Sequence, residues 1–462
     1  MTFEEIIDKI FQAYDVRGIY PDELNGDVAY RMSRAAVAYS GAKSVIIGRD
    51  MRRGGHALLS ALAMGAMDQG ADVTDAGMCS SDALYCAGFK GQHDLSLMVT
   101  ASHNPGEFNG TKFVRKDGTS IGRTTGLLDV KKMVLTGKFP KPRRRGSISR
   151  FDKTMPQFVR HALSFINRRK LKPFKIVVDA GNGMGGELIK LLQRYVPFKI
   201  VPMYFEPDGS FPNHDADPTR PECVEILRRR VRKEKADLGL GFDGDADRAA
   251  LVDEKGGLIN GSELGSVICK KILAQQPGAR IGYCLVSSWI KRDSIIQYGG
   301  RPVITPVGGA NIRPIMKKQD VAFVSERSGH FYMRRNNYAD SGLVAALIAL
   351  EQLSEAGRTL SELMQQYRRY YMAPELSLML GTDKSTAKEL AGIKKKMTAR
   401  VKDIAKGSRI IHCNEDRYEF DDWWFCVRPS GTEPRKLRMT VEATSKKLLD
   451  EKYAVIRRLL TK

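Results

Sequence analysis

Three carboxylates alternate along Asp243-Gly244-Asp245-Ala246-Asp247-Arg248, directly after an apolar run at residues 237–242 that predicts a strand. Alternate side chains of an extended chain point to one side, so these carboxylates are expected to converge. Clustered carboxylates repel one another unless a cation lies between them, and their oxygens suit Mg²⁺ or Ca²⁺ and not zinc. A metal-free acidic turn is the alternative, and an EF-hand is disfavoured because no flanking helices are predicted. The motif therefore predicts a site for a hard divalent cation.

A serine stands where a second strand-like run, residues 94–99, ends and the chain turns sharply. The turn is Thr100-Ala101-Ser102-His103-Asn104-Pro105, in which His103 adjoins Ser102 and Pro105 restricts the backbone. Loops held by a rigid scaffold commonly carry reactive side chains. A Ser-His pair in a turn is also common without any function. The functional interpretation of this Ser-His pair therefore depends on the other motifs of the chain.

Glu326, Ser328 and His330 also alternate, after a predicted strand at residues 321–324. They offer an acceptor, a hydroxyl group and a titratable ring on one side of the chain. Such a set suits the hydroxyl groups of a sugar. A single histidine would more often be structural, but this one belongs to a constellation.

Arg428 opens a polar turn after the apolar run at residues 423–427, and Ser430, Gly431 and Thr432 follow in it. Backbone N–H groups of such a turn, together with a guanidinium, form a concave phosphate site. An ordinary exposed turn is the alternative. The apolar run weakens that alternative because it would hold the turn rigidly. Near the chain start, Tyr14 and Arg17 share a turn in which we expect Arg17 to face a ligand.

The elements that must position these motifs alternate between strands and helices. Strands are predicted at residues 44–48, 175–179 and 281–286, and helices at 27–40, 54–70, 155–167, 221–236, 262–274 and 446–460. Alternation of this kind favours largely parallel sheets with helices on their faces. A length of 462 residues suggests about three domains. Residues 138–150, rich in proline and arginine, are interpreted as the first linker.

Gly181, Gly183 and Gly186 fit a dinucleotide-binding pattern between a predicted strand and a predicted helix. Glu206 lies where the ribose partner of such a site is expected, although prolines flank it. The same glycines would also permit a tight strand-to-helix turn. A nucleotide-linked oxidoreductase is therefore one competing interpretation.

The net charge of +22 favours anionic partners, either nucleic acid or phosphorylated metabolites. No RNP, KH or finger motif supports nucleic acid. The seven cysteines form no C-x-x-C pair, which is typical of a reduced cytosolic protein without structural zinc. The acidic start of the chain does not predict a secretory signal, and the apolar run at residues 342–350 is too short to span a bilayer. We expect a cytoplasmic protein.

Taken together, the four motifs resemble the α-D-phosphohexomutase family, closest to its phosphomannomutase/phosphoglucomutase branch. Their order and spacing match that family along nearly the whole chain. The resemblance implies an α/β fold with three related α/β domains containing mixed sheets, plus a smaller α+β C-terminal domain, around one central cleft. The expected domains are residues 1–148 with the phosphoserine, 149–256 with the metal, 257–370 for sugar recognition and 371–462 for phosphate binding.

The resemblance also implies the reaction and its residues. A phosphoryl group would move between the 1- and 6-positions of mannose or glucose through a phosphoserine and a hexose 1,6-bisphosphate, which would also serve as activator. Ser102 would carry that group, and Mg²⁺ would be bound by Asp243, Asp245, Asp247 and a phosphoserine oxygen. The remaining catalytic residues would be His103, Lys112, Arg17, Arg248 and His330, with the substrate bound by Tyr14, Glu326, Ser328, Arg428, Ser430, Gly431 and Thr432.

The chain departs from its relatives in two places. Val307-Gly308-Gly309-Ala310 has glycine where many relatives carry a histidine or another polar residue, and Cys284-Leu285-Val286-Ser287-Ser288 lacks a lysine that some bacterial relatives place in the cleft. Both departures leave the sugar preference and the proton-transfer partner open. Phosphoglucosamine mutase is an alternative activity, and a polyanion-binding or nucleic-acid-binding protein is an alternative of another class. We expect a phosphorylated hexose as partner, no nucleic acid, no membrane, and a monomer or homodimer.

Overall fold

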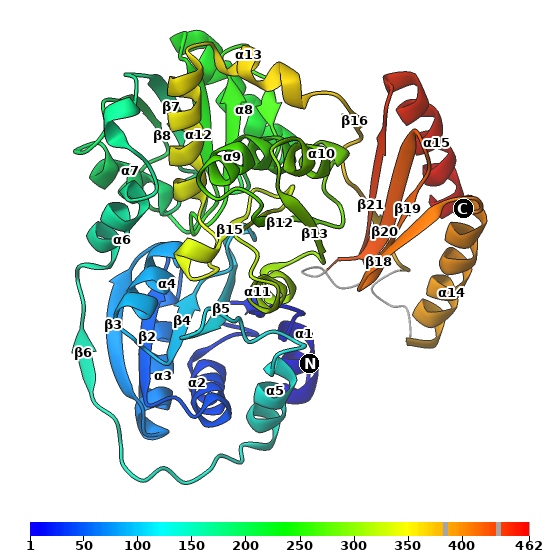
Figure 1. The fold of residues 1–462 in the computed structure, drawn as a ribbon. Coiled ribbons are helices and arrows are strands. Elements are labelled where there is room, and N and C mark those ends of the chain that lie inside the picture. Colours follow the sequence, from blue (N-terminus) through cyan, green and yellow to red (C-terminus); the bar gives the residue numbers. More distant parts are fainter. Residues whose placement is uncertain (382–386, 431–435, 462) are drawn as a thin grey trace.

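The computed structural model describes residues 1–381, 387–430 and 436–461. Four units, each built on its own sheet, follow one another along the chain (Figure 1). The first three lie against one another, and the terminal unit, coloured orange to red, stands to one side and joins the third through β16. The expected fold class, three α/β units and a smaller α+β unit, is confirmed.

The first sheet has the strand order β1-β5-β4-β2-β3-β6. β2 pairs in parallel with β3 and β4, and β5 runs antiparallel to β4. The strands are Val16–Ile19 (β1), Ser44–Arg49 (β2), Asp72–Met78 (β3), Leu95–Val99 (β4), Phe108–Arg115 (β5) and Ile148–Arg150 (β6). The helices are Phe3–Ile10 (α1), Gly26–Ser40 (α2), Gly55–Asp68 (α3), Ser81–Lys90 (α4) and Leu127–Thr136 (α5).

The second sheet has the strand order β11-β10-β9-β7-β8. β7 pairs in parallel with β8 and β9, and β10 runs antiparallel to β9. The strands are Lys175–Asp179 (β7), Lys199–Met203 (β8), Leu238–Phe242 (β9), Ala249–Asp253 (β10) and Leu258–Ile259 (β11). The helices are Thr154–Leu163 (α6), Gly185–Leu192 (α7) and Pro221–Glu234 (α8), with a 3₁₀ turn at Arg168–Lys170.

The third sheet has the strand order β13-β12-β14-β15. β12 pairs in parallel with β13 and β14, and β15 runs antiparallel to β14. The strands are Arg280–Cys284 (β12), Arg301–Thr305 (β13), Phe323–Ser325 (β14) and Phe331–Met333 (β15). The helices are Gly261–Gln275 (α9), Trp289–Gln297 (α10), Gly309–Lys318 (α11), Gly342–Ala356 (α12) and Leu360–Met364 (α13).

These three sheets repeat one arrangement of four strands. The repeat consists of β2–β5 in the first sheet, β7–β10 in the second and β12–β15 in the third. In each repeat, the first of these strands lies between the second and the third, in parallel with both, and the fourth runs antiparallel to the third. The serine motif lies between β4 and β5, the acidic motif between β9 and β10, and the Glu326 motif between β14 and β15. All three motifs therefore occupy the same turn of the repeat, the one that joins its third and fourth strands.

The terminal sheet has the order β16-β21-β20-β19-β18, with β17 also paired to β21. Its strands are Tyr371–Met372 (β16), Leu376–Met379 (β17), Arg409–Cys413 (β18), Glu415–Glu419 (β19), Trp423–Pro429 (β20) and Lys436–Ala443 (β21). The helices Ala387–Ile404 (α14) and Lys446–Thr461 (α15) accompany it. Arg428, expected to open a turn, instead lies within β20, opposite Arg438 of β21.

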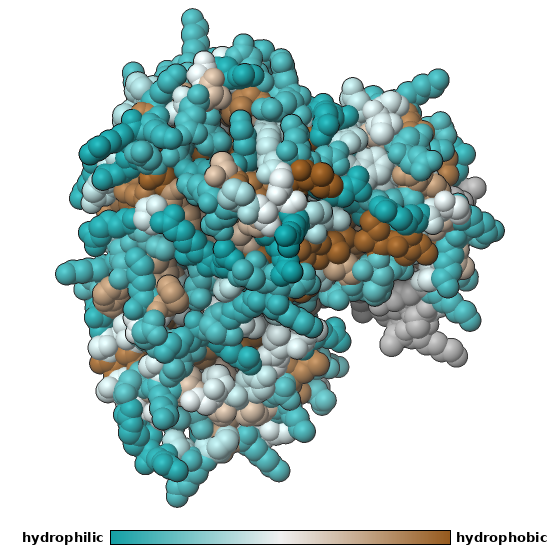
Figure 2. Space-filling model, in the orientation of Figure 1, coloured by the Kyte–Doolittle hydropathy of each residue, from teal (hydrophilic) through white to brown (hydrophobic). Residues whose placement is uncertain are grey.

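The apolar core explains which units are joined firmly. One buried cluster runs from α4 of the first unit through α6 and α7 to α9 and α12 of the third, and the terminal unit has a separate cluster. A smaller cluster, which includes Trp289 and Trp424, lies between the third and terminal units. Figure 2 shows a mostly hydrophilic face with an apolar band where the terminal unit meets the rest. Among the described residues, no helix is long and apolar enough to cross a membrane.

Most predicted elements are present with shifts of a few residues at their ends. The helix predicted near residues 342–350 is α12, and it is almost entirely buried. The linker interpretation of residues 138–150 was wrong at its end, because β6 adds a short parallel strand beside β3. All three residues of β6 are exposed, so no apolar alternation marked this strand in the sequence. The expected boundary between residues 148 and 149 falls inside β6.

Candidate active site

The serine turn holds Ser102 in an unusual backbone conformation. Its φ is +52°, a left-handed value that is uncommon for residues other than glycine, and the residue is 2% exposed. Its N–H donates to Thr100 Oγ1 at 2.8 Å, and its hydroxyl donates to Asp243 Oδ2 at 2.8 Å. The hydroxyl of the first unit is thus hydrogen-bonded to a carboxylate of the second.

The acidic turn brings Asp243, Asp245 and Asp247 together as the sequence predicted. All three are buried, and each offers an oxygen within 4.8 Å of the others. Oδ1 of Asp245 and Oδ1 of Asp247 are buried without a hydrogen-bond partner among the described residues. Such oxygens are costly to bury unless a cation or donor satisfies them. The donor set therefore fits a hard divalent cation.

Two cationic side chains hold the same carboxylates. Lys112, on β5, places Nζ 2.7 Å from Asp245 Oδ2 and 2.6 Å from Asp247 Oδ2, and Arg248 Nε donates to Asp243 Oδ2 at 2.8 Å. Burial opposes ionisation of Asp245, but Lys112 outweighs it and keeps the pKa of that carboxyl below its usual range. Burial and the charge of Asp245 raise the pKa of Asp247 to about 7. Lys112 and Arg248 together therefore offset much of the negative charge of the three carboxylates.

The two predicted histidines differ in their surroundings. His103 Nδ1 lies 3.3 Å from Ser102 Oγ, and burial together with the Arg248 charge holds the pKa of His103 well below its usual value. His330 Nδ1 lies 2.7 Å from Asp340 Oδ2. Burial lowers the pKa of His330, but the Asp247 and Asp340 charges outweigh it and raise that pKa. These surroundings favour the neutral form of His103 and the protonated form of His330.

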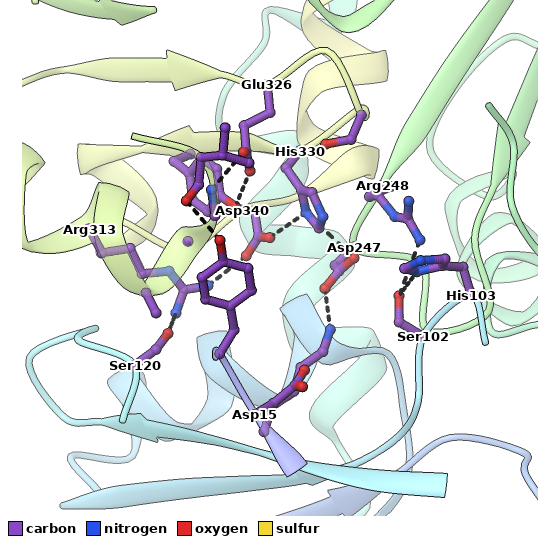
Figure 3. Close-up of a pocket in the computed structure, with 18 of the residues that line it drawn as sticks. Asp15, Ser102, His103, Ser120, Asp247, Arg248, Arg313, Glu326, His330 and Asp340 are labelled. Atoms are coloured by element: carbon purple, nitrogen blue, oxygen red, sulfur yellow. Dashed lines mark hydrogen bonds and ion pairs between the residues drawn. The ribbon is translucent and has the colours of Figure 1, made fainter. Parts of the chain in front are cut away.

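The third turn contributes Glu326, whose carboxylate is fixed from two directions. It accepts from Gly308 N–H at 2.8 Å and from the Tyr332 hydroxyl at 2.8 Å (Figure 3). Ser328 and His330 of the same turn line the cavity beside it. The acceptor, hydroxyl group and ring therefore share one side, as the alternation predicted.

One cavity collects residues from all four units. Of the residues predicted from the sequence, it is lined by Tyr14, Arg17, Ser102, His103, Lys112, Asp247, Arg248, Glu326, Ser328, His330, Arg428 and Ser430. Asp243 and Asp245 lie behind it and contact its lining through Ser102 and Lys112. Gly431 and Thr432 fall outside the described residues.

Arg17 lines the cavity, but its guanidinium serves the serine turn. It donates to Ala101 O at 3.0 Å and to Asn104 Oδ1 at 2.6 Å, and it pairs with Asp15 at 2.9 Å. Tyr14 donates its hydroxyl hydrogen to Val307 O at 3.2 Å. Arg17 therefore holds the serine turn and also lines the cavity in which a ligand would bind.

Tyr14 lies against one glycine of the first departing segment, residues 307–310. Gly308 has a φ of +92°, and a side chain there would collide with the Tyr14 ring. The other departure is not compensated by the nearest lysine along the chain. Lys291, near the start of α10, is fully buried with Nζ donating to Gly265 O at 2.7 Å, and it does not line the cavity.

The terminal unit brings two arginines to the cavity, Arg428 on β20 and Arg438 on β21. Glu375 lies between them, 3.3 Å from an Arg428 nitrogen and 3.5 Å from an Arg438 nitrogen. Ser430 N–H donates to Lys436 O at 2.8 Å, which continues the pairing beyond the end of β20. A phosphate here would meet cations supplied by a unit that does not carry the serine.

Sequence reasoning missed several residues of the cavity. Asp340 accepts from His330 and pairs with Arg313 at 2.6 Å, and Arg313 in turn donates to Ser120 at 3.1 Å (Figure 3). Asp340 lies just before a buried apolar helix, where an acidic residue resembles an ordinary helix cap. The sequence signal that could have identified Asp340 is an acidic residue directly before an apolar helix, ten positions after His330. The other missed lining residues include Asp15, Asp217, Thr219, Tyr332, Glu375 and Arg438.

The glycine pattern after β7 serves packing. A side chain at Gly183 would collide with Gly244 of the acidic turn, and one at Gly186 would collide with Phe205. Glu206 is exposed and pairs with Lys190 at 3.2 Å. The glycines allow the loop after β7 and the start of α7 to pack closely against the acidic turn and Phe205. Close packing therefore accounts for the glycine pattern, and a dinucleotide is not needed to explain it.

The densest basic runs are engaged in surface ion pairs. Arg144 pairs with Asp72, and Arg145 lies 2.7 Å from Asp68. On α8, Arg229 lies 3.0 Å from Glu225. Because these arginines have carboxylate partners, their runs do not by themselves define a nucleic-acid surface.

The α/β units and the cavity with its clustered cations and carboxylates suit an enzyme that transfers a phosphoryl group. Four family profiles match the chain in order. They are the phosphoglucomutase/phosphomannomutase alpha/beta/alpha domain I over residues 8–137, domain II over 156–257, domain III over 260–370 and the C-terminal domain over 381–458. The chain belongs to the phosphoglucomutase/phosphomannomutase family. It is a phosphohexomutase, an isomerase of carbohydrate metabolism that transfers a phosphoryl group.

Named relatives match over almost the full chain. A phosphomannomutase of Salmonella montevideo is 34% identical over 440 residues, and a protein of Xanthomonas campestris named phosphohexose mutases is 34% identical over 438 residues, each with 94% of both chains covered. A crystal structure of a phosphoglucomutase/phosphomannomutase family protein from Burkholderia thailandensis superposes with a TM-score of 0.87 at 28% identity, covering 100% of this chain and 97% of the other. An N-acetylphosphoglucosamine mutase of Aspergillus fumigatus, in complex with GlcNAc-6P and magnesium, shares the fold at 15% identity and a TM-score of 0.60, covering 100% of this chain and 98% of the other.

Proposed function

We propose that the enzyme interconverts hexose 1-phosphate and hexose 6-phosphate, with mannose and glucose as the sugars, through a phosphoserine at Ser102 and a hexose 1,6-bisphosphate. The observation that carries this proposal is the hydrogen bond between the buried Ser102 hydroxyl and Asp243, at the mouth of a cluster of carboxylates and cations. Phosphoryl transfer depends on positioning and on neutralising charge, and this cavity supplies both.

The proposed step moves one phosphoryl group between two oxygens. The bond from phosphorus to Ser102 Oγ breaks as a bond to a sugar hydroxyl oxygen forms, and the proton of that hydroxyl leaves to a cavity base. When a phosphate returns to Ser102, neutral His103, 3.3 Å from Ser102 Oγ, would accept the serine proton, and protonated His330 would donate a proton to the leaving sugar oxygen. In the opposite direction, His103 would give that proton back to Ser102 Oγ, and His330 would accept the proton of the sugar hydroxyl. The bisphosphate then turns over, and its other phosphate returns to Ser102.

Asp243, Asp245 and Asp247 are the proposed Mg²⁺ ligands, together with an oxygen of phosphorylated Ser102. The bound ion would withdraw charge from the transferring phosphoryl group. Lys112 and Arg248 would hold the carboxylates in place and attract the developing charge on phosphate oxygens. Arg17 would keep the serine turn in position from the opposite side.

The sugar and the idle phosphate would be held away from the serine. We assign sugar hydroxyls to Glu326 and Ser328, and the non-reacting phosphate to Arg428 and Ser430, with Gly431 and Thr432 predicted to complete that turn. A loop that binds phosphate accepts either end of the bisphosphate, because it does not read the ring. Tyr14 would close the side of the cavity above Gly308.

The relatives named phosphomannomutase favour mannose phosphates, and glucosamine phosphate is the alternative substrate. A coupled assay with mannose 1-phosphate, glucose 1-phosphate and glucosamine 1-phosphate separates these sugars. Added glucose 1,6-bisphosphate or mannose 1,6-bisphosphate is expected to activate enzyme that has lost its phosphoryl group. A cytoplasmic location, a monomer or homodimer, and domains at 1–148, 149–256, 257–370 and 371–462 stay predictions.

The test of the central assignment is intact mass and turnover of Ser102→Ala. Wild-type enzyme incubated with Mg²⁺ and hexose bisphosphate should gain the mass of one phosphoryl group, and the variant should gain none. Turnover should fall by about 10⁴-fold or more, because the nucleophile is removed. Ser40→Ala, at the end of α2 and outside the cavity, is the control. A variant that keeps wild-type turnover would exclude Ser102 from the reaction.

A further inference from the structure

Arg52 lies beneath the serine turn, and it neither lines the cavity nor reaches solvent. Its side chain is 0% exposed. Nη1 donates to Pro105 O and Phe108 O, both at 2.8 Å, and Nη2 donates to Ser102 O at 2.7 Å and Asn104 O at 2.5 Å. All four terminal N–H groups of one guanidinium therefore bind carbonyl groups, three in the serine turn and one at Phe108, the first residue of β5.

A second chain of contacts reaches the other side of Ser102. Asp50, which lies 3.5 Å from Arg52 Nε, accepts from the Thr100 hydroxyl at 2.5 Å. Thr100 Oγ1 in turn accepts from Ser102 N–H at 2.8 Å. The backbone N–H and C=O of Ser102 are thus both fixed by the Asp50–Arg52 pair, one directly and one through Thr100. This arrangement holds the left-handed φ of the serine against its intrinsic preference.

Arg52 also touches the second unit. The Phe211 ring lies 4.8 Å from the guanidinium carbon, and a side chain at Gly209 would collide with the Arg52 backbone. A side chain at Gly244, in the acidic turn, would collide with Ser102 O, the carbonyl group that Arg52 binds. Arg52 therefore lies where the serine turn meets residues 209–211, which pack beside Gly244 of the acidic turn.

We propose that Arg52 is a positioning residue that sets the distance between Ser102 Oγ and the three aspartates, and thereby the rate of phosphoryl transfer. The proposal rests on the proposed role of Ser102. Arg52 acts through the backbone, because it holds the carbonyl groups along the serine turn and leaves the hydroxyl free to react. A lysine offers one nitrogen in place of a planar fork and does not reproduce four directed hydrogen bonds.

The test compares Arg52→Lys, Arg52→Ala and Arg53→Ala, assayed with Mg²⁺ and glucose 1-phosphate or mannose 1-phosphate. Arg53 is the exposed neighbour and serves as control. Arg52→Lys should lower kcat by on the order of 10²-fold, because a shift of about 1 Å in a reacting group has an effect of that size. KM should change little, since the residues assigned to the sugar hydroxyls and to the non-reacting phosphate lie on other units. Arg53→Ala should keep both constants.

Guanidinium ion separates positioning from general loss of structure. In Arg52→Ala, millimolar guanidinium, well below denaturing concentrations, should restore part of kcat, and an equal concentration of NaCl should not. If Arg52→Ala does not fold, the kcat and KM of Arg52→Lys decide the question. Wild-type kcat in folded Arg52→Lys overturns the proposal. So does a parallel loss of kcat and thermal stability in Arg52→Ala with no recovery by guanidinium.

Phosphorylation of Ser102 is measured first by intact mass in the wild type. Absence of phosphoserine there would defeat the proposed function, whatever Arg52 does. Phosphoserine in the wild type together with unchanged transfer in the Arg52 variants would defeat this proposal alone. The rate of phosphate transfer from phosphorylated Arg52→Lys to hexose phosphate, in a single turnover, should fall as kcat does.

Discussion

The serine turn and the acidic turn occupy the same place in two repeats of one strand arrangement, yet they are held in different ways. The serine turn, residues 100–107, is fixed through its backbone, whose carbonyl groups bind Arg52. The acidic turn, residues 243–248, is fixed through its side chains, which bind Lys112 and Arg248. A neutral hydroxyl needs only a defined position, whereas gathered carboxylates need opposite charge.

The same position in the strand repeat can therefore carry either a hydroxyl group or a cluster of carboxylates, depending on how the turn is held. In both turns a cationic side chain binds oxygens of the turn, but the oxygens belong to the main chain in one and to side chains in the other. The two turns also touch, since Gly244 leaves no room for a side chain beside Ser102 O. Changes that alter charge should therefore affect the acidic turn most, and changes that alter shape should affect their contact.

The largest effect is expected where charge is removed from the acidic turn. Asp245→Asn should lower kcat by on the order of 10²-fold or more, because it loses a proposed metal ligand and the partner of Lys112. Chelator should abolish wild-type turnover, and added Mg²⁺ should restore it. Steady-state kinetics and calorimetric Mg²⁺ titration measure both effects. Turnover that resists chelator would contradict the metal assignment.

The turn at residues 326–330 occupies the same position in the third repeat, and its carboxylate, Glu326, is proposed to bind substrate and not metal. Glu326→Ala should reduce kcat/KM for mannose and glucose 1-phosphates alike, by the equivalent of about 1.5–3 kcal/mol for a charged hydrogen bond. Mg²⁺ affinity should stay at its wild-type value. Glu326→Gln, which keeps the shape, should lose less. An unchanged kcat/KM in both variants would remove Glu326 from the sugar site.

The contact between the two turns is tested by adding one carbon atom. Gly244→Ala places Cβ against Ser102 O, so the turns must separate by a small distance. We expect kcat to fall by about 10-fold, with KM little changed, because only the spacing of reacting groups is altered. Gly26→Ala, where the nearest atom lies 3.9 Å away, is the control. Equal kcat in both variants would show that the contact tolerates the extra carbon.

The smallest effect concerns Lys291, a buried lysine whose ammonium binds a carbonyl group, in contrast to Lys112 with its carboxylates. Burial lowers the pKa of Lys291 to about 8, so the folded state binds fewer protons than the unfolded chain between pH 8 and the ordinary lysine value. Stability from this residue therefore rises with pH across that window. Lys291→Met should remove the rise and increase stability at pH 7 by about 1 kcal/mol. Thermal unfolding at several pH values measures it, and an unchanged pH slope would contradict it.

Much of the site was predictable because its residues come in short motifs. Asp243, Asp245 and Asp247 alternate after a strand, and so do Glu326, Ser328 and His330, so the short spacing of each set keeps its members in one turn between two paired strands. The α/β class and most elements followed from the alternation of apolar strands and amphipathic helices. The short strand β6 did not, since its residues are exposed and carry no pattern.

The residue types of each turn can be read from the sequence, because residue type and spacing within a few positions are local properties. Which turns meet, and which buried groups hold them, depends on the tertiary structure. Arg52 lies fifty positions before Ser102, and Asp340 joins His330 to Arg313 across separate elements. Such contacts depend on the packing of whole units, and a single arginine after a strand carries no mark of the four carbonyl groups it will bind.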